Sequence, residues 1–355
     1  MSSHLGNHGS IRTDVFRGTR LESFHEAVAV AYHASGKVLQ YGPIDEGTHL
    51  RSVAKPFQAL AMLRAGILES FSITPRELAV ICASHAGQPV HRELVRGLLQ
   101  RGGLSEKDLQ CGIHPPFSRS ARQMCIANKE LLDSTCNNCS GKHSGMLLAT
   151  ICQQQSKESY LDADHPLQRN IRAIFELFTS EKIEEGSASV DGCGAPTYHM
   201  KLISIARAFQ RLHQTEFLDR IGLTDRVNQI HDAIASHPKA FSGEGRWPLL
   251  WRPYLAGNFL AKEGAEGVMV IWGKKGSLVL KCLDGSDRGL IHAVPELLQR
   301  LHWIDQNTYE RWVGENNPVV TNVSGRIVGQ IQVDIPEPLE LDDPNTSVSG
   351  MGLVR

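Results

Sequence analysis

"HEAVAVAYHASGKVLQYG", residues 25–42, contains two apolar runs on either side of Ala-Ser-Gly-Lys. Two apolar runs around a short turn that contains glycine are the pattern of a β-hairpin. The stretch 267–285, "GVMVIWGKKGSLVLKCLDG", repeats this pattern around Lys-Lys-Gly-Ser. The sequence therefore predicts antiparallel strands that come from both ends of the chain.

The region between these hairpins is predicted to be helical. Apolar residues recur there at helical spacing, and loops rich in Gly, Pro, Asn and Cys separate the segments. The clearest segments are 92–101, 166–178 and 200–212, and residues 288–304 form a further helix after the second hairpin. The predicted fold class is α/β of the α+β type, in which helices flank an antiparallel sheet and a helical region is inserted.

A single catalytic domain is expected over residues 20–355. Its sheet comes from about 25–42 and 267–335, and its helical region covers about 58–260. Residues 1–19 are expected to form a disordered tail. Neither an internal repeat nor a low-complexity linker interrupts the sequence.

Composition and charge exclude several functional classes. The chain has 355 residues, of which 41% are hydrophobic and 21% charged, as in ordinary globular proteins. Its 37 basic and 38 acidic residues give a net charge of −1, which does not favour nucleic acid or a membrane surface as partner. We found neither an apolar run of membrane-spanning length nor a secretory signal, so we expect a cytoplasmic protein. The eight cysteines are then reduced thiols or metal ligands.

The stretch "RSVAKPFQ", residues 51–58, has a serine three residues before a lysine. Pro56 is tolerated in the first turn of a helix, so a helix is predicted from Val53 to Arg64. The hydroxyl of Ser52 and the amine of Lys55 would then lie about one turn apart. A desolvated, neutral lysine can take the proton of a serine, although an N-cap serine beside a solvated lysine has the same spacing.

Two further residues are candidates for the same chemistry. Ser84 in "ICASHAGQP" follows an apolar run, where an element passes into a loop. Lys262 immediately precedes the second hairpin, in the place that a Lys-Thr-Gly element takes in serine β-lactamases, but here a glutamate replaces the threonine.

Cysteines in two glycine-rich loops are candidate metal ligands. Cys136 and Cys139 form a C-x-x-C pair, which by itself fits a redox pair, half of a zinc site or two structural thiols. Cys193 lies in "VDGCGAPTYHM", and the spacing alone does not bring the two loops together. His143 is a loop histidine or lines the site, and Asp191 either forms a turn or receives the ammonium group of a ligand.

Seven segments together resemble the class 3, or rhizobial-type, L-asparaginases of the asparaginase II family. The resemblance runs from about residue 20 to 335. It implies a homodimeric amidohydrolase with a fold like that of serine β-lactamases and penicillin-binding proteins, and zinc near the catalytic serines. The segments are "RSVAKPFQAL", "CASHAGQPVHRE", "CGIHPP", "CNNCSGKHSGMLLA", "DGCGAPTY", "SGEGR" and "AKEGAEG".

The resemblance also implies roles for individual residues. It pairs Ser52 with Lys55 and Ser84 with Lys262 as two catalytic Ser-Lys pairs. The implied substrate is L-asparagine, whose side-chain amide would be hydrolysed to L-aspartate and ammonia. The implied zinc ligands are Cys139, Lys142 and Cys193, and the implied substrate-binding residues are Arg51, Asp191 and His143.

Two other functions fit the same residues. Ser-Lys chemistry also serves enzymes that hydrolyse β-lactams or peptide amides. A zinc-dependent binding protein on an inactive hydrolase scaffold is the alternative outside enzymes, and it requires the Ser-Lys pairs to be incidental. The expected partner is a small-molecule substrate.

Overall fold

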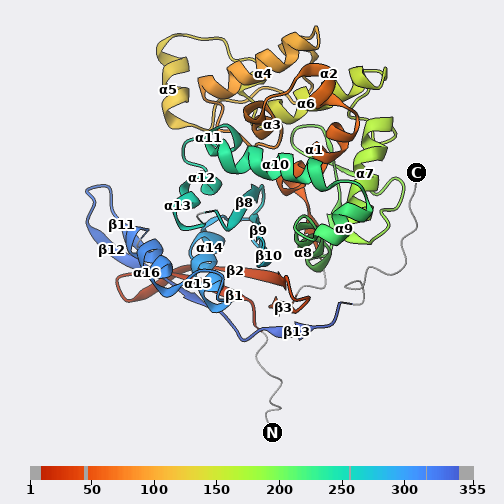
Figure 1. Ribbon diagram of the computed structural model, residues 1–355. Helices are drawn as coiled ribbons and strands as arrows, with labels where there is room; N and C mark the ends of the chain where they lie inside the picture. The colour runs from red at the N-terminus through yellow and green to blue at the C-terminus, as the bar shows by residue number, and fades with distance from the viewer. Residues whose placement is uncertain (1–8, 44–46, 256, 317, 344–355) are drawn as a thin grey trace. The chain divides into compact units, whose positions relative to one another are not determined.

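A computed structural model describes residues 9–43, 47–255, 257–316 and 318–343 (Figure 1). The chain divides into two compact units, which are described separately below. Among the described residues, the strand-rich unit takes those within 9–48, 200–210 and 253–343. The helical unit takes residues 49–199 and 211–252. The expected single domain over 20–355 remains a prediction.

The strand-rich unit contains a nine-stranded sheet in which all the pairings described are antiparallel. The strand order is β11-β12-β1-β2-β10-β9-β8, and β3 pairs with both β2 and β13. Both predicted hairpins are present, as β2–β3 and β9–β10. The strands are β1 (Ile11–Arg17), β2 (Arg20–His33), β3 (Val38–Tyr41), β8 (Phe259–Gly264), β9 (Val268–Gly273), β10 (Gly276–Cys282), β11 (Val319–Thr321), β12 (Ile327–Asp334) and β13 (Leu339–Leu341).

Strand β1 corrects the predicted disordered tail. Residues 11–17 lie between β2 and β12 in the sheet, and their side chains alternate between buried and half-buried. Arg12 is opposite Asp334 in the register, so the partner strand is distant in the sequence. Residues 1–8 of the predicted tail lie outside the described residues.

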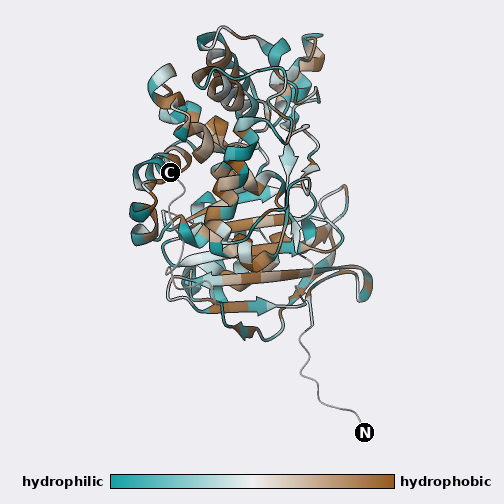
Figure 2. Ribbon diagram, turned by 90° about the vertical axis from the view of Figure 1, so that its right-hand side faces the viewer, coloured by the Kyte–Doolittle hydropathy of each residue, from teal (hydrophilic) through white to brown (hydrophobic). Residues whose placement is uncertain are grey.

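Apolar side chains on the central strands form the core of this unit. All six residues of β9 are buried, and Figure 2 shows hydrophobic residues along the strands of the sheet. Trp272 of β9 packs against Phe209 with ring centroids 5.0 Å apart. Burial on this scale is the main force that holds the helices to the sheet. The helices are α8 (Leu202–Arg211), α14 (Arg288–Ile291), α15 (Ala293–Arg300) and α16 (Gln306–Glu315), and α13 (Arg252–Leu255) begins at the boundary of the unit. Together with the sheet, these helices confirm the predicted α+β fold class.

The helical unit contains the segments predicted at 92–101 and 166–178. Two-residue strands β4 (Thr48–His49) and β7 (His199–Met200) lie where the chain passes between units. The other elements are η1 (Arg51–Ala54), α1 (Lys55–Arg64), α2 (Ile67–Phe71), α3 (Pro75–Ile81), α4 (Pro89–Arg101), η2 (Glu106–Asp108), α5 (Arg119–Ala127), η3 (Ser134–Cys136), α6 (Ser140–Cys152), α7 (Pro166–Thr179), β5 (Ser189–Val190), β6 (Pro196–Thr197), α9 (Thr215–Arg220), α10 (Thr224–Ser236), α11 (Pro238–Phe241) and α12 (Trp247–Leu250).

Helix α6 is buried almost along its whole length, and two glycines allow its close packing. A Cβ atom on Gly141 would lie 2.2 Å from the carbonyl oxygen of Val80 on α3. A Cβ atom on Gly145 would lie 2.8 Å from the sulfur of Met62 on α1. The glycines therefore let α6 pack directly against α1, which carries Lys55, and against α3, which precedes the loop of Ser84.

We expect Gly141→Ala to destabilise the protein by at least about 1–3 kcal/mol, because the new methyl group meets backbone that cannot rotate away. Gly97→Ala is the matched control. Gly97 also lies inside a helix, α4, but a Cβ atom there meets nothing within 4 Å. The control should gain about 0.5–1 kcal/mol from its higher helix propensity. Urea denaturation measures both changes, and equal stability of the two variants would contradict the packing argument.

Two histidines of the helical unit, the buried His91 and the half-buried His231, predict a loss of stability in mild acid. Burial lowers the pKa of His91 to about 4, and burial with the nearby His213 lowers the pKa of His231 to about 3. The unfolded chain titrates near the ordinary value of 6.5, so below that pH it binds more protons than the folded protein. The free energy of unfolding should therefore fall by about 2 kcal/mol for each of these histidines between pH 6.5 and 5.

Urea unfolding at pH 6.5 and pH 5 measures this loss. His231→Gln removes one titrating group, so its stability should fall less over this interval than that of the parent. An identical fall in both proteins would contradict the assignment.

Candidate active site

Ser52 and Lys55 lie at a junction between two kinds of helix. Residues 51–54 form the 3₁₀ turn η1, and α1 begins only at Lys55. The predicted helix start at Val53 is therefore two residues early, although the helix ends at Arg64 as predicted. Arg51 opens the turn with φ = 47°, a left-handed conformation that is uncommon for a residue other than glycine and costs energy.

The amine of Lys55 contacts Ser84, a residue from another loop. Lys55 Nζ lies 2.9 Å from the Oγ atom of Ser84 and donates to the carbonyl oxygen of Ala83 at 2.5 Å. A longer contact of 3.5 Å reaches the carbonyl of Asn138. The backbone N–H of Lys55 donates to the carbonyl of Ser52. Within residues 47–255 no hydrogen bond joins their side chains, so the catalytic pairing of these two residues remains a prediction.

The surroundings of Lys55 favour its neutral form. Burial lowers its pKa below the ordinary value of 10.5, and the positive charge of Lys142 acts in the same direction, against the opposing effect of the two nearby thiols. Its side chain is only 1% exposed. In this contact Lys55 Nζ donates to Ser84 Oγ, and an amine in its neutral form has a lone pair that can accept a proton.

A chain of hydrogen bonds fixes the loop that follows Ser84. Gly87 N–H donates to His85 Nδ1, which leaves the proton of His85 on Nε2. His85 Nε2 then donates to Ser140 Oγ at 2.9 Å, and Ser140 donates to the carbonyl of Thr135. His85 and Ser140 therefore connect the loop of Ser84 to the start of α6. Sequence reasoning missed this link, although both residues stand next to predicted ones.

The three predicted zinc ligands lie together. Lys142 Nζ is 3.0 Å from Cys193 Sγ, and the thiol of Cys139 is hydrogen-bonded to Cys193. The two glycine-rich loops that the sequence could not connect are thus brought together. None of the eight cysteines is in a disulfide, which agrees with the expectation of reduced thiols or metal ligands.

The protonation states of these three groups depend on one another. The hydrogen bond from Cys139 and the adjacent Lys142 lower the pKa of Cys193 to about 5, so Cys193 is a thiolate near neutrality. That hydrogen bond, together with burial, raises the pKa of Cys139 to about 12. Burial acts to lower the pKa of Lys142, but the neighbouring Cys193, together with Cys139, outweighs burial and raises the value. The amine would have to lose a proton in order to bind a metal.

Arg51 and Asp191 form an ion pair at 2.5 Å. Burial raises the pKa of the Asp191 carboxyl, but the charges of Lys142 and Arg51 outweigh it and lower the value. Cys193 Sγ lies 3.6 Å from a carboxylate oxygen of Asp191, so the ion pair adjoins the thiol cluster. The backbone N–H of Arg51 donates to Thr197 Oγ1 on β6, which ties η1 to the loop of Asp191.

His143 is fully buried on α6, and its Nδ1 is 2.7 Å from the hydroxyl of Tyr160. Burial, with the charge of the neighbouring Lys142, holds its pKa well below the ordinary value, so the ring is neutral. Within the described residues, its Nε2 atom has no hydrogen-bond partner. A direct role of His143 in substrate binding remains a prediction.

Residues 13–333 match the family model of L-asparaginase II. This match covers nearly all of the sheet and the whole cluster of Ser52, Lys55, Ser84 and Cys193. The chain belongs to the L-asparaginase II family. The expected family is therefore confirmed.

Structural comparison also finds crystal structures of Mglu, one in a native form and one in a tris and glutamate form. They are 13% identical to this chain, with TM-scores of 0.41 and 0.43, and each alignment covers 79% of it. This asparaginase-family chain spans 60% of one Mglu chain and 66% of the other. The comparison with curated proteins finds no match.

Lys262, the fourth predicted catalytic residue, lies on β8, which ends the strand order of the sheet. It is 1% exposed, and its Nζ donates to the carbonyl of Glu263. Its position at an edge strand agrees with the sequence prediction, and its pairing with Ser84 remains a prediction.

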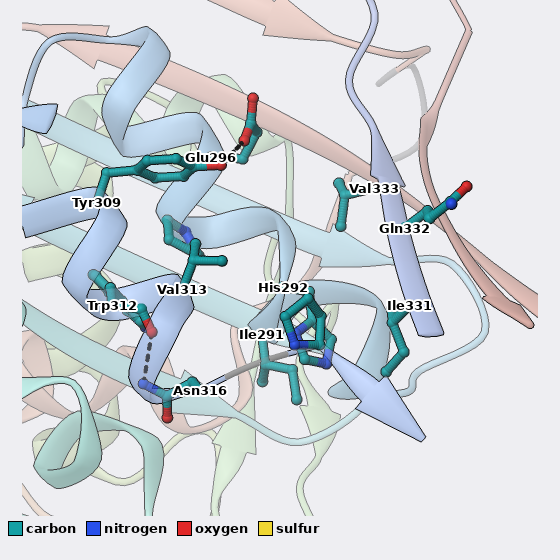
Figure 3. A pocket seen from close by; sticks show the side chains of 12 residues that line it. Ile291, His292, Glu296, Tyr309, Trp312, Val313, Asn316, Ile331, Gln332 and Val333 are labelled. Atoms are coloured by element: carbon teal, nitrogen blue, oxygen red, sulfur yellow. Dashed lines mark hydrogen bonds between the residues drawn. The ribbon is translucent and has the colours of Figure 1, made fainter. Parts of the chain in front are cut away.

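A pocket of about 390 Å³ in the strand-rich unit contains none of the predicted site residues. Its walls come from α14 to α16 and from β12, and Figure 3 shows His292 and Glu296 among its lining. Among the described residues, no helix is both long and apolar enough to cross a membrane.

Proposed function

We propose that this protein is an L-asparaginase that hydrolyses the side-chain amide of L-asparagine to L-aspartate and ammonia. The observation that carries the proposal is the buried contact between Lys55 and Ser84 in a chain of the L-asparaginase II family. A serine hydroxyl needs a base beside it, and burial favours the neutral, basic form of the Lys55 amine.

In the proposed reaction Ser52 attacks the amide carbon and its proton passes to Lys55. The carbon–nitrogen bond breaks, ammonia leaves, and water then hydrolyses the β-aspartyl ester on Ser52. Ser84 exchanges protons with Lys55 across their 2.9 Å contact, and Lys262 is assigned to the same relay. This relay delivers a proton to the departing nitrogen and later takes one from the attacking water.

Arg51 and Asp191 are proposed to hold the α-carboxylate and the α-ammonium group of the substrate. They already form an ion pair with each other, so both charges are held at the site before a ligand arrives. An α-amino acid presents one group of each sign at fixed spacing. His143, the third residue assigned to substrate binding, would act from its buried position on α6.

Zinc is proposed to bind to Cys139, Lys142 and Cys193. The donors fit, since two sulfurs and an amine converge and Cys193 is already ionised near neutrality. A bound zinc ion would supply positive charge that orients the substrate. With three protein ligands, a fourth position stays open.

Cys193→Ala should weaken zinc binding and raise KM for L-asparagine about tenfold, the effect of losing one charge-assisted contact. Zinc content by metal analysis and KM by steady-state kinetics measure the two changes. The control is Cys152→Ala, at a half-buried cysteine on the last residue of α6. Unchanged KM in a zinc-free Cys193→Ala enzyme would contradict the orienting role.

The decisive test of the proposed function is ammonia release by the purified protein from L-asparagine, with L-glutamine and benzylpenicillin assayed in parallel. Release from L-asparagine supports the proposal. Hydrolysis of penicillin alone would favour a β-lactam-hydrolysing enzyme, and no reaction in the presence of zinc would favour a binding protein. Light scattering of the same sample tests the proposed homodimer, and cell fractionation tests the proposed cytoplasmic location.

A further inference from the structure

Three potential metal ligands meet at one end of the sheet, in the strand-rich unit. His25 lies on β2, and Cys282 is the last residue of β10, its neighbour. Cys282 is opposite Ala27 in the register, so His25 lies just past the end of β10. Asp284 follows in the turn after Cys282, and this turn is tied back to β2 by a hydrogen bond from Leu283 N–H to the carbonyl of Glu26.

The side chains of His25 and Cys282 both contact the carboxylate of Asp284. His25 Nδ1 lies 2.6 Å from one carboxylate oxygen of Asp284, and Cys282 Sγ lies 3.0 Å from the other. One donor atom from each residue lies within 4.8 Å of the other two. Tetrahedral zinc holds its sulfur, nitrogen and oxygen ligands about 3–4 Å from one another, so these atoms need only small shifts to surround an ion.

The backbone packs so closely around the cluster that only glycine fits at two neighbouring positions. A Cβ atom on Gly289 of α14 would lie 2.6 Å from Cys282 Sγ and 2.8 Å from His25 Cβ. A Cβ atom on Gly267 would lie 2.7 Å from Cys282 Cβ. Cys282 is fully buried, whereas 47% of the Asp284 side chain is exposed, so an ion could enter past the carboxylate.

We propose that His25, Cys282 and Asp284 form a second metal site, which binds Zn²⁺ or a similar divalent transition metal. Thiolate, imidazole and carboxylate together suit zinc and disfavour magnesium or calcium, which prefer oxygen ligands alone. The site shares no residue with the proposed zinc site of Cys139, Lys142 and Cys193. It stands apart from the proposed function, because a metal here would connect β2 to the turn after β10 and stabilise the sheet.

A purely structural role is the competing interpretation. Asp284 Oδ1 also accepts from the backbone N–H of Ser286, as in an ordinary turn, and the ion pair with His25 could do no more than fix that turn. His25 Nε2 has no hydrogen-bond partner in the part of the chain that the structure describes. A metal-binding histidine usually donates its second N–H to a partner, so we expect weaker zinc binding than in sites that have one.

The test is zinc stoichiometry of the full-length protein after treatment with a chelator and titration with zinc alone. The variants are Cys282→Ser and Asp284→Asn, with Cys152→Ser as the cysteine control and Cys193→Ser to remove the other proposed site. Each variant of the second site should bind one zinc ion fewer than the parent, and Cys152→Ser should bind the same number. The loss should occur in the Cys193→Ser background as well, which separates this site from the proposed active site.

Cobalt(II) gives a second readout, because thiolate ligation produces an intense charge-transfer absorption. In the Cys193→Ser protein this band should remain and should disappear when Cys282→Ser is added. The Asp284→Asn variant is expected to fold as the parent does, because Asp284 is partly exposed and asparagine has nearly the same shape. It therefore keeps the test valid if Cys282→Ser misfolds. Unchanged stoichiometry in both Cys282→Ser and Asp284→Asn would overturn the proposal, whatever their activity on L-asparagine.

Discussion

Lys55→Met lowers the turnover of L-asparagine at least about a thousandfold, the expected scale when the base of a serine hydrolase is lost. Methionine fills nearly the same buried space, but its thioether is not basic enough to take a serine proton, and it has no N–H for Ser84 or for the carbonyl of Ala83. Initial rates of ammonia release at saturating substrate measure the effect.

A matched control separates chemistry from folding. Lys157→Met removes a half-exposed lysine that is paired with Asp108 in the same unit, and its turnover should stay within about twofold of the parent. Urea denaturation then shows whether the Lys55→Met protein is folded. A folded Lys55→Met enzyme with more than a tenth of the parent turnover would remove Lys55 from the mechanism.

Ser52→Ala should abolish both turnover, by at least about a thousandfold, and the covalent intermediate. Ser84→Ala should slow turnover about 10²- to 10⁴-fold, the range of general acid–base catalysis, but still allow acylation of Ser52. Mass spectrometry of acid-quenched reactions locates the β-aspartyl adduct on one peptide or the other. Ser156→Ala, at an exposed serine, is the control and should behave as the parent does.

The position of the adduct decides which serine is the nucleophile. An adduct on the peptide of Ser84 in the parent would exchange the roles of the two serines. The observed contact makes this outcome chemically reasonable, because Lys55 reaches Ser84 directly. The absence of any adduct in Ser84→Ala, with full acylation of the parent, would contradict the relay role of Ser84.

The two hairpins could be predicted because the residues that define each of them are neighbours in the sequence. In 25–42 and 267–285 the apolar runs and the turn residues lie side by side in the sequence. Strand β1 has a comparable alternation, but its second partner, β12, is more than 300 residues away, and its central inward position is a threonine. Thr13 is buried and donates to the carbonyl of Gly289, a contact that sequence spacing does not reveal.

The site was predictable as a set of residues and not as a set of contacts. Family resemblance named Lys55 and Ser84, yet assigned them to different pairs. Their contact depends on where the loop after α3 meets the start of α1, which tertiary packing decides. The same holds for Lys142 and Cys193, which are 51 residues apart and lie 3.0 Å from each other.

The pairing of Arg12 with Asp334 also bears on how the protein is made. During synthesis on the ribosome, β1 and β2 emerge early and must wait for β10 and β12 before both their edges are covered. Unpaired strand edges favour association with other chains. The helical unit draws most of its residues from one continuous segment, 49–199, and can begin to fold while the sheet is incomplete. We therefore expect nascent chains that stop before β10 to depend on chaperones, with the exposed edges of β1 and β2 as the surface to be protected.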